Sequence, residues 1–275
     1  MTYRNDVELW PAPDLSAELL RGRFSNFTYD MHVHDTACFA LITSGAIRIR
    51  MRGKTFVARQ GDLYAIDADE PHAGWAVDDA GWTQRTLYVD RGVLDGLAGV
   101  EPKGRSRFLG PVLHDRELNS VFYGIHRCSQ EDGSMLKRHD WYARFARLLS
   151  ERYLSRPVQP SRAGDEPLAV KRAREFLDQR IASKVSLGDI ADACGLPPFR
   201  ILRAFEKSTG MSPHAYQRLA RLRMAQRQLR GGEPLAAIAV GTGYADQAHL
   251  TRAFKAAYGI APATFRRAIT QPRTA

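Results

Sequence analysis

Cysteine is scarce in this chain of 275 residues, and long apolar runs are missing. The three cysteines stand far apart and form no CxxC pair, so they do not indicate a disulfide framework and they fit a reducing compartment. No apolar run approaches the roughly 18 residues that span a bilayer, and the N-terminus is too polar and acidic for a signal-peptide core. We therefore expect a cytoplasmic protein without a membrane partner.

Motifs of several enzyme classes are also missing. The sequence has no Walker motif for nucleotide phosphates, no nucleophile elbow and no pair of carboxylates placed as catalytic acid and base. Apart from a few histidines in the N-terminal half, nothing predicts catalysis, and we expect no enzyme. With 44% hydrophobic residues, the chain is long enough to bury the cores of two ordinary domains.

The formal net charge of +10 is confined to one part of the chain. Residues 1–155 contain 20 Lys and Arg against 21 Asp and Glu, a net charge of −1. Residues 156–275 contain 20 against 9, a net charge of +11. Such segregation is typical of a protein in which one of two domains binds a polyanion such as DNA. The N-terminal part must have another role.

Short strands followed by helices are predicted in the N-terminal half. Apolar and basic residues alternate from Ala46 to Met51, and Gly53-Lys54 then indicates a turn. Further short strands are indicated at 63–66 and 86–89. From 113 to 153 the apolar spacing becomes helical. A small barrel or sandwich followed by two helices is expected.

Residues 155–167 are rich in Pro, Ser and charge and lack apolar periodicity, which is typical of a linker. The signals after this segment are helical, including an S-x-x-D capping box that begins at Ser186. We therefore expect an N-terminal domain at 1–154, an all-α domain at 168–268 and a tail at 269–275.

The predicted helical domain contains the same pattern twice. The sequence RAFEKSTGMSP is echoed by RAFKAAYGIAP 49 residues later. In each copy a short helix (187–194; 235–242) precedes a second helix (198–208; 246–258), the helix-turn-helix layout that places the second helix in a major groove. A duplicated helical bundle is the alternative, and it leaves unexplained the exposed side chains near the start of each second helix.

The residue types at these helix starts suit base recognition. Arg can donate two hydrogen bonds to guanine, Gln can pair with adenine, and an apolar side chain can contact the thymine methyl group. Basic residues on the connecting helix expected at 215–230 are candidates for phosphate contact, although a solvated face is their commoner role. The expected DNA-binding residues are Phe199, Arg200, Arg203, Gln247, His249 and Arg252 at bases, with Arg218 and Arg221 at phosphates.

These motifs resemble the DNA-binding domain of the AraC/XylS family of bacterial transcriptional regulators. The family pattern I-A-x-x-x-G, L-x-R-x-F-K and Y-G-x-x-P-x-x-F-R occurs in order between residues 238 and 266. Pro197-Pro198 and Leu202 depart from the family pattern around the start of the first recognition helix. The resemblance implies a sequence-specific regulator, expected as an activator, that binds promoter DNA as a homodimer and has RNA polymerase as a candidate partner.

The N-terminal half resembles the cupin-type sensor domain of the same family. The segment MHVHD supplies His32 and His34, Cys38 follows, and His72 stands in EPH. The implied fold is α+β, with a cupin-like β-barrel and following helices before the all-α domain with its two helix-turn-helix units. Alternate residues of a strand share a face, so His32 and His34 can both face the barrel interior, where His72 can join them.

Three interpretations of these histidines stay open. With Cys38 they can bind zinc or another soft divalent ion, although metal-binding cupins usually have a glutamate where Cys38 stands. They can instead hold the carboxylate of a small-molecule effector, the role that we favour, or be hydrogen-bonded core residues. The expected effector-binding residues are His32, His34, Cys38, His72, Tyr64 and Trp75, and the expected metal ligands are His32, His34 and His72.

The sequence thus predicts a ligand-responsive, sequence-specific transcriptional regulator. The main rival is a metal-dependent cupin enzyme, such as a dioxygenase, fused to a DNA-targeting module; the missing carboxylate ligand argues against it. A nonspecific architectural DNA-binding protein is a third hypothesis. Charge neutralisation alone does not require two ordered helix-turn-helix units with Gln and Arg at base-facing positions, which argues against this hypothesis.

Overall fold

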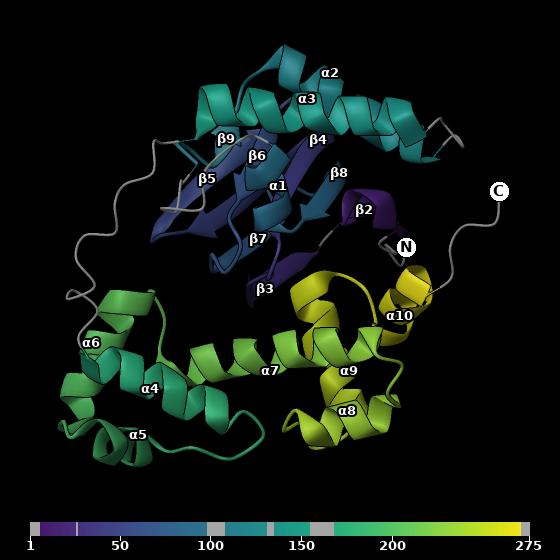
Figure 1. Ribbon diagram of the computed structural model, residues 1–275. Coiled ribbons are helices and arrows are strands. Elements are labelled where there is room, and N and C mark those ends of the chain that lie inside the picture. The colour runs from purple at the N-terminus through teal and green to yellow at the C-terminus, as the bar shows by residue number, and fades with distance from the viewer. Residues whose placement is uncertain (1–5, 26, 98–107, 131–134, 155–167, 271–275) are drawn as a thin grey trace. The chain divides into compact units, whose positions relative to one another are not determined.

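A computed structural model describes residues 6–25, 27–97, 108–130, 135–154 and 168–270. Among the described residues, the chain forms two compact units, an N-terminal unit with residues 6–154 and a C-terminal unit with residues 168–266 (Figure 1). In the described residues, all of the strands belong to the N-terminal unit, while the C-terminal unit is entirely helical. This arrangement confirms the predicted α+β fold class. The predicted linker at 155–167 lies outside the described residues.

The N-terminal unit is built on strands that pair antiparallel throughout. These strands are β1 (Asp6–Ala12), β2 (Ala17–Phe24), β3 (Thr28–His32), β4 (Ala37–Met51), β5 (Lys54–Arg59), β6 (Leu63–Ile66), β7 (His72–Ala76), β8 (Trp82–Val89) and β9 (Val112–Leu113), with the short 3-10 helix η1 (Pro13–Leu15) between the first two. One sheet has the order β1-β2-β8-β4-β6-β9. The long strand β4 continues into a second sheet, where it pairs with β5 and β7, and β7 pairs with β3.

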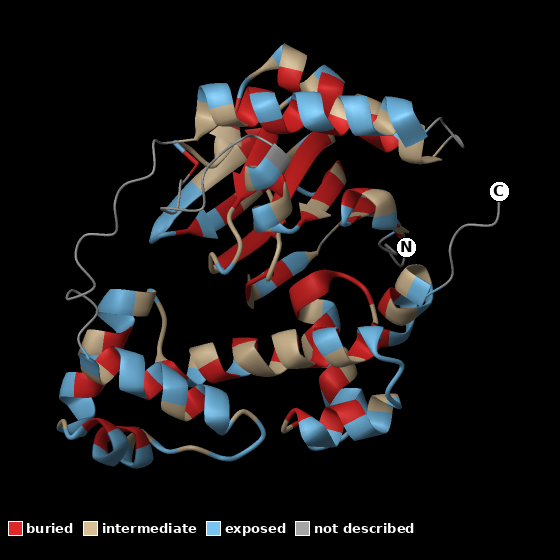
Figure 2. Cartoon of the chain, viewed as in Figure 1, coloured by how far each residue is buried: buried red, intermediate tan, exposed pale blue. Residues whose placement is uncertain are grey.

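Both faces of the first part of the shared strand β4 are buried, from Ala37 to Ile42 (Figure 2). Phe39 and Leu41 belong to a core that the helices complete, whereas Ala40 and Ile42 belong to a second core inside the strands. Because side chains alternate along a strand, one strand can serve two cores. The hairpin from β4 to β5 turns at Arg52 and Gly53, with positive φ angles of 52° and 71°.

Three helices follow strand β8 in the N-terminal unit: α1 (Arg91–Leu97), α2 (Arg116–Gln130) and α3 (Met135–Tyr153). Helices α2 and α3 lie together over the sheet (Figure 1). Leu118, Phe122 and Ile125 of α2 are fully buried, as are Phe145 and Leu149 of α3. The helical spacing predicted between residues 113 and 153 is therefore confirmed, because its apolar residues form one face of each helix.

His126 of α2 is a titratable side chain that is fully buried. Its ring contacts Trp10 of β1 edge-on, with centroids 5.8 Å apart, and Phe122 at 4.9 Å. Burial first, and then the positive charge of Arg85, hold the pKa of His126 well below its usual value of about 6.5. The folded unit therefore excludes a proton that the unfolded chain takes up below about pH 6.5.

We expect the N-terminal unit to lose stability as the pH falls from 7 to 5, by up to about 1.4 kcal/mol per pH unit for each excluded proton. The variant His126→Phe should weaken that dependence by about one proton. All four tryptophans lie in this unit, so urea unfolding followed by tryptophan fluorescence measures it selectively. An unchanged slope in His126→Phe would contradict the assignment.

The C-terminal unit consists of α4 (Leu168–Gln179), α5 (Leu187–Cys194), α6 (Pro198–Thr209), α7 (Pro213–Arg230), α8 (Leu235–Gly241), α9 (Gln247–Tyr258) and α10 (Pro262–Thr270). Helices α5 and α6 form the first predicted helix-turn-helix, and α8 and α9 form the second. The long helix α7 connects the two (Figure 1). No helix in the described part of the chain is long and apolar enough to cross a membrane.

Local capping interactions explain where these helices begin and end. Ser186 accepts a hydrogen bond from the backbone of Asp189, whose carboxylate accepts one from the Ser186 backbone, so the predicted capping box at α5 is confirmed. Asp246 caps α9 through the His249 amide. The two recognition helices both end at a glycine in the left-handed conformation, Gly210 and Gly259. These equivalent caps account for the equal spacing of the repeat.

Candidate effector pocket and DNA interface

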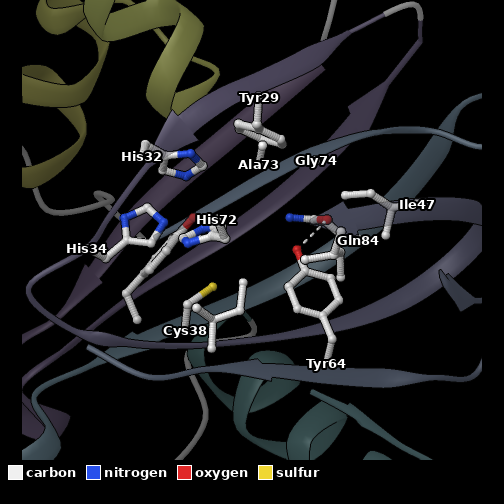
Figure 3. Close-up of a pocket in the computed structure, with 13 residues that line it drawn as sticks. Tyr29, His32, His34, Cys38, Ile47, Tyr64, His72, Ala73, Gly74 and Gln84 are labelled. Carbon is white, nitrogen blue, oxygen red and sulfur yellow. Dashed lines mark hydrogen bonds between the residues drawn. The ribbon is translucent and has the colours of Figure 1, made fainter. Parts of the chain in front are cut away.

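Three histidines meet inside the N-terminal unit (Figure 3). His32 ends β3 and His72 begins β7, and the two are direct partners in the antiparallel register. His34 lies in the connection after β3. The ring centroids are 4.1 Å apart for His32 and His72, 4.8 Å for His32 and His34, and 5.1 Å for His34 and His72. The structure thus brings together all three predicted metal ligands, each of them buried.

Backbone carbonyl groups fix the tautomers of two of these rings. Nδ1 of His32 donates a hydrogen bond to the carbonyl of Asp30 at 2.7 Å, and Nδ1 of His72 donates one to the carbonyl of Glu70 at 2.9 Å. A carbonyl oxygen can only accept, so Nδ1 of each ring carries the proton in these two bonds. Burial also lowers the pKa of His72 to about 4, which keeps the ring neutral at pH 7.

A buried polar network lies beside the histidines. The Tyr64 hydroxyl donates to Oε1 of Gln84 at 3.0 Å, and Nε1 of Trp82 donates to the same oxygen at 2.7 Å. Nε2 of Gln84 in turn donates to the Thr86 hydroxyl at 3.0 Å. These contacts satisfy the amide of Gln84 and hold Tyr64 toward the pocket (Figure 3).

The histidines line one pocket together with Tyr64 and Gln84 of this network, and the cavity has a volume of about 20 Å³. Among the predicted effector-binding residues, the pocket is lined by His32, His34, Cys38, His72 and Tyr64. Trp75 is half-buried on β7 and is not part of the lining. Sequence patterns did not indicate Tyr29, Gln84 or Tyr88, which also line it.

The thiol and phenol groups of this pocket are neutral. Burial raises the pKa of the Cys38 thiol and the pKa values of the Tyr29, Tyr64 and Tyr88 hydroxyls. The lining includes no carboxylate. The pocket therefore offers neutral nitrogen, sulfur and oxygen atoms and no negative charge.

The candidate DNA-binding side chains lie on the solvent faces of the two recognition helices. In α6, Ile201 and Phe205 are fully buried, whereas Phe199 is 73% exposed and Arg200 and Arg203 are exposed. In α9, the buried face is formed by Leu250, Phe254, Ala257 and Tyr258, and the exposed side chains include Gln247, His249 and Arg252. The two helices thus present the predicted base-contacting residues to solvent.

The two predicted phosphate contacts on α7 differ in their surroundings. Arg218 is exposed. Arg221 is half-buried, and its Nε, Nη1 and Nη2 atoms donate hydrogen bonds to the backbone carbonyls of Ile181, Gly243 and Ser183. These bonds indicate a structural role for Arg221 in place of the predicted phosphate contact.

Comparison with known families agrees with this two-part architecture. Residues 15–150 match the AraC-like ligand binding domain, and residues 190–268 match a helix-turn-helix domain. The chain belongs to the AraC family of transcriptional regulators. It is a DNA-binding regulator with an N-terminal ligand-binding domain and a C-terminal helix-turn-helix domain.

Relatives of this AraC-family regulator span nearly its whole length. The chain is 24% identical over 245 residues to the uncharacterized HTH-type transcriptional regulator YbfI of Bacillus subtilis, covering 86% of this chain and 87% of that protein. It is 29% identical over 246 residues to the HTH-type transcriptional activator RhaS of Pectobacterium carotovorum, covering 86% of each. The crystal structure of ToxT from Vibrio cholerae with a bound unsaturated fatty acid is 11% identical, covers 98% of each chain and superposes with a TM-score of 0.56, which shows a shared fold.

The variant Arg252→Ala tests base recognition by α9. If Arg252 contacts a guanine, we expect a loss of about 1 to 3 kcal/mol in specific binding and relaxed preference at one base position. Binding competition against duplexes with single base changes measures both. Lys171→Ala removes one positive charge from an exposed position on α4 and is the matched control. An equal loss on every sequence would assign Arg252 to a phosphate instead.

Proposed function

We propose that this AraC-family regulator is controlled by a divalent transition-metal ion bound by His32, His34 and His72. The observation that carries the proposal is the placement of three buried imidazoles whose candidate ligand nitrogens all lie within 4.8 Å of one another. The carbonyls of Asp30 and Glu70 hold two of the rings in the tautomer that a metal requires. Hydrogen bonds from the other ring nitrogen to a carbonyl commonly orient metal-binding histidines.

The size of the cavity favours an ion over an organic effector. A volume of about 20 Å³ is room for roughly one water molecule or a small ion with its remaining ligand.

The ligand chemistry favours zinc or a similar ion. Neutral imidazoles suit Zn²⁺, Ni²⁺, Cu²⁺ and Fe²⁺, whereas Mg²⁺ and Ca²⁺ require oxygen ligands. Zinc–nitrogen bonds of about 2.0–2.1 Å in a tetrahedral site require nitrogens about 3.4 Å apart, so binding draws the rings together. Because His32 and His72 stand on paired strands, the ion tightens the contact between β3 and β7. The lining has no carboxylate, so a fourth ligand would come from a neutral pocket group or from solvent.

The DNA-binding role rests on the exposed side chains of the two recognition helices. We infer that α6 and α9 contact the bases of promoter DNA through Phe199, Arg200, Arg203, Gln247, His249 and Arg252, with Arg218 at a phosphate. The relatives are transcriptional regulators, which supports a site that senses an ion and performs no turnover. A cytoplasmic homodimer that acts on RNA polymerase at the promoter agrees with that role.

The test compares metal content and DNA binding in one preparation. The full chain is stripped with a chelator, and footprints on the DNA flanking its own gene are recorded before and after adding Zn²⁺, Ni²⁺, Co²⁺ or Mg²⁺. We expect one bound transition-metal ion per chain and a change in protected sites with such an ion, but none with Mg²⁺. Protection that is identical in all samples, together with no stoichiometric metal, would refute the proposal.

A further inference from the structure

Arg221 of α7 donates hydrogen bonds to the connection that leads into the first helix-turn-helix unit and to the turn inside the second. Its Nε donates to the carbonyl of Ile181 at 2.7 Å and its Nη2 to that of Ser183 at 2.9 Å. Both carbonyls belong to the connection between α4 and α5, directly before the first helix-turn-helix unit. Its Nη1 donates to the carbonyl of Gly243 at 3.0 Å, in the turn between α8 and α9 of the second unit.

The same connection is bound by a second side chain of α7. Nε2 of the buried Gln217 donates to the carbonyls of Arg180 at 2.9 Å and Ser183 at 3.1 Å. Gln217 stands one helical turn before Arg221, so both side chains project from the same side of α7. Of these two side chains, Arg221 also donates a hydrogen bond to the second helix-turn-helix unit, at Gly243.

The two units also touch at Gly243. A Cβ atom at this position would stand 2.7 Å from the carbonyl oxygen of Ala182 and 2.8 Å from its Cα. The φ angle of Gly243 is +78°, which already favours glycine. The backbone of the second turn therefore packs directly on the connection of the first unit, beside the three bonds of Arg221.

We propose that Arg221 is a positioning residue that locks the two helix-turn-helix units together and so fixes the spacing and angle between α6 and α9. Guanidinium suits this task because its donors form a rigid planar fork that reaches several carbonyls at once. Lysine has a single ammonium group and cannot reproduce the three directions. The proposal does not depend on what the N-terminal unit binds.

If Arg221 holds the two helix-turn-helix units rigidly together, its loss should affect DNA sites with two subsites differently from DNA sites with one. After one helix-turn-helix unit binds its subsite, the rigid connection holds the other unit at the second subsite. The effective concentration of the second unit at that subsite is therefore raised. Loss of the Arg221 hydrogen bonds should weaken binding to DNA with both subsites and leave binding to DNA with one subsite nearly unchanged. It should also make the protein more tolerant of changes in the distance between subsites.

The experiment uses the purified full chain and a duplex that the wild-type protein selects from a random pool. Three probes are compared: the selected duplex, the same duplex with one footprinted subsite scrambled, and the same duplex with one base pair inserted between subsites. Arg221→Gln and Arg221→Lys should each bind the selected duplex on the order of 10- to 100-fold more weakly. On the scrambled duplex both should stay within about twofold of wild type, and the penalty for the insertion should shrink.

Several results would overturn the proposal. Equal losses on the selected and scrambled duplexes, with Arg221→Lys near wild type, would mean that Arg221 contacts a phosphate; Arg218→Gln shows what that pattern looks like. Wild-type affinity on all probes would mean that the lock is irrelevant to binding. Helical circular dichroism at 10 °C checks folding, and Arg221→Lys carries the comparison if Arg221→Gln unfolds. Unfolding of both variants would make Arg221 a stability residue and refute the positioning role.

Discussion

Replacing His72 with alanine is expected to lower the affinity for Zn²⁺ by at least about 100-fold. The substitution removes one of three nitrogen ligands from a site with no carboxylate to take its place. Even loss of a residue that only orients a metal ligand commonly costs 10- to 100-fold, so loss of a ligand should cost no less. Competition with a chromophoric zinc chelator measures the affinity, and elemental analysis measures the stoichiometry.

The matched control is His114→Ala, which removes an exposed histidine from the same unit. It should bind zinc like the wild type. Tryptophan fluorescence confirms that both variants keep the folded N-terminal unit, because every tryptophan lies there. If His72→Ala bound zinc as tightly as His114→Ala, the three histidines would be core residues and the metal proposal would fail.

Replacing Phe205 with alanine is expected to destabilise the C-terminal unit by about 3 to 5 kcal/mol. Phe205 of α6 is fully buried, and its ring packs edge-on against Tyr216 of α7 at 5.6 Å between centroids. Since whole domains are stable by only about 5 to 15 kcal/mol, a loss of this size removes much of the folded population and with it DNA binding. Thermal unfolding followed by helical circular dichroism tests this.

The same helix offers the control Phe199→Ala. Phe199 is 73% exposed, so its removal should change stability by less than about 0.5 kcal/mol. Its effect should be confined to DNA binding, where we propose that it contacts a base. Equal destabilisation by the two variants would contradict the assignment of one phenylalanine to the core and the other to the DNA interface.

Periodicity predicted the helices better than the strands. Helix α5 has the expected bounds, and α6 and α9 differ from the prediction by one residue at one end. Caps such as Ser186 and Asp246 act within a few residues, so a local pattern suffices to place them. Strands β1 and β2 and helix α1 were not predicted. Their stability depends on pairing and packing with distant segments, as in the pairing of β2 with β8.

The candidate site was predicted in part for the same reason. The spacing of His32, His34 and His72 suggested a cluster, and the register of β3 and β7 brings it together. Gln84 and Tyr88 belong to β8. The alternation of side chains along a strand shows which residues share a face, but it does not show which distant segment packs against that face. Arg221 was taken for a phosphate contact because its partners are backbone carbonyls, which no sequence pattern identifies.

The sequence by itself determined the two-part organisation, the duplicated helix-turn-helix and the charge that suits DNA, because these depend on spacing and composition along the chain. Only the tertiary structure decided the volume of the effector pocket, the tautomers of its histidines and the partners of Arg221. Each of these depends on atoms that are distant in sequence and adjacent in space. The proposed metal site and the proposed positioning of the two helix-turn-helix units by Arg221 rest on those contacts.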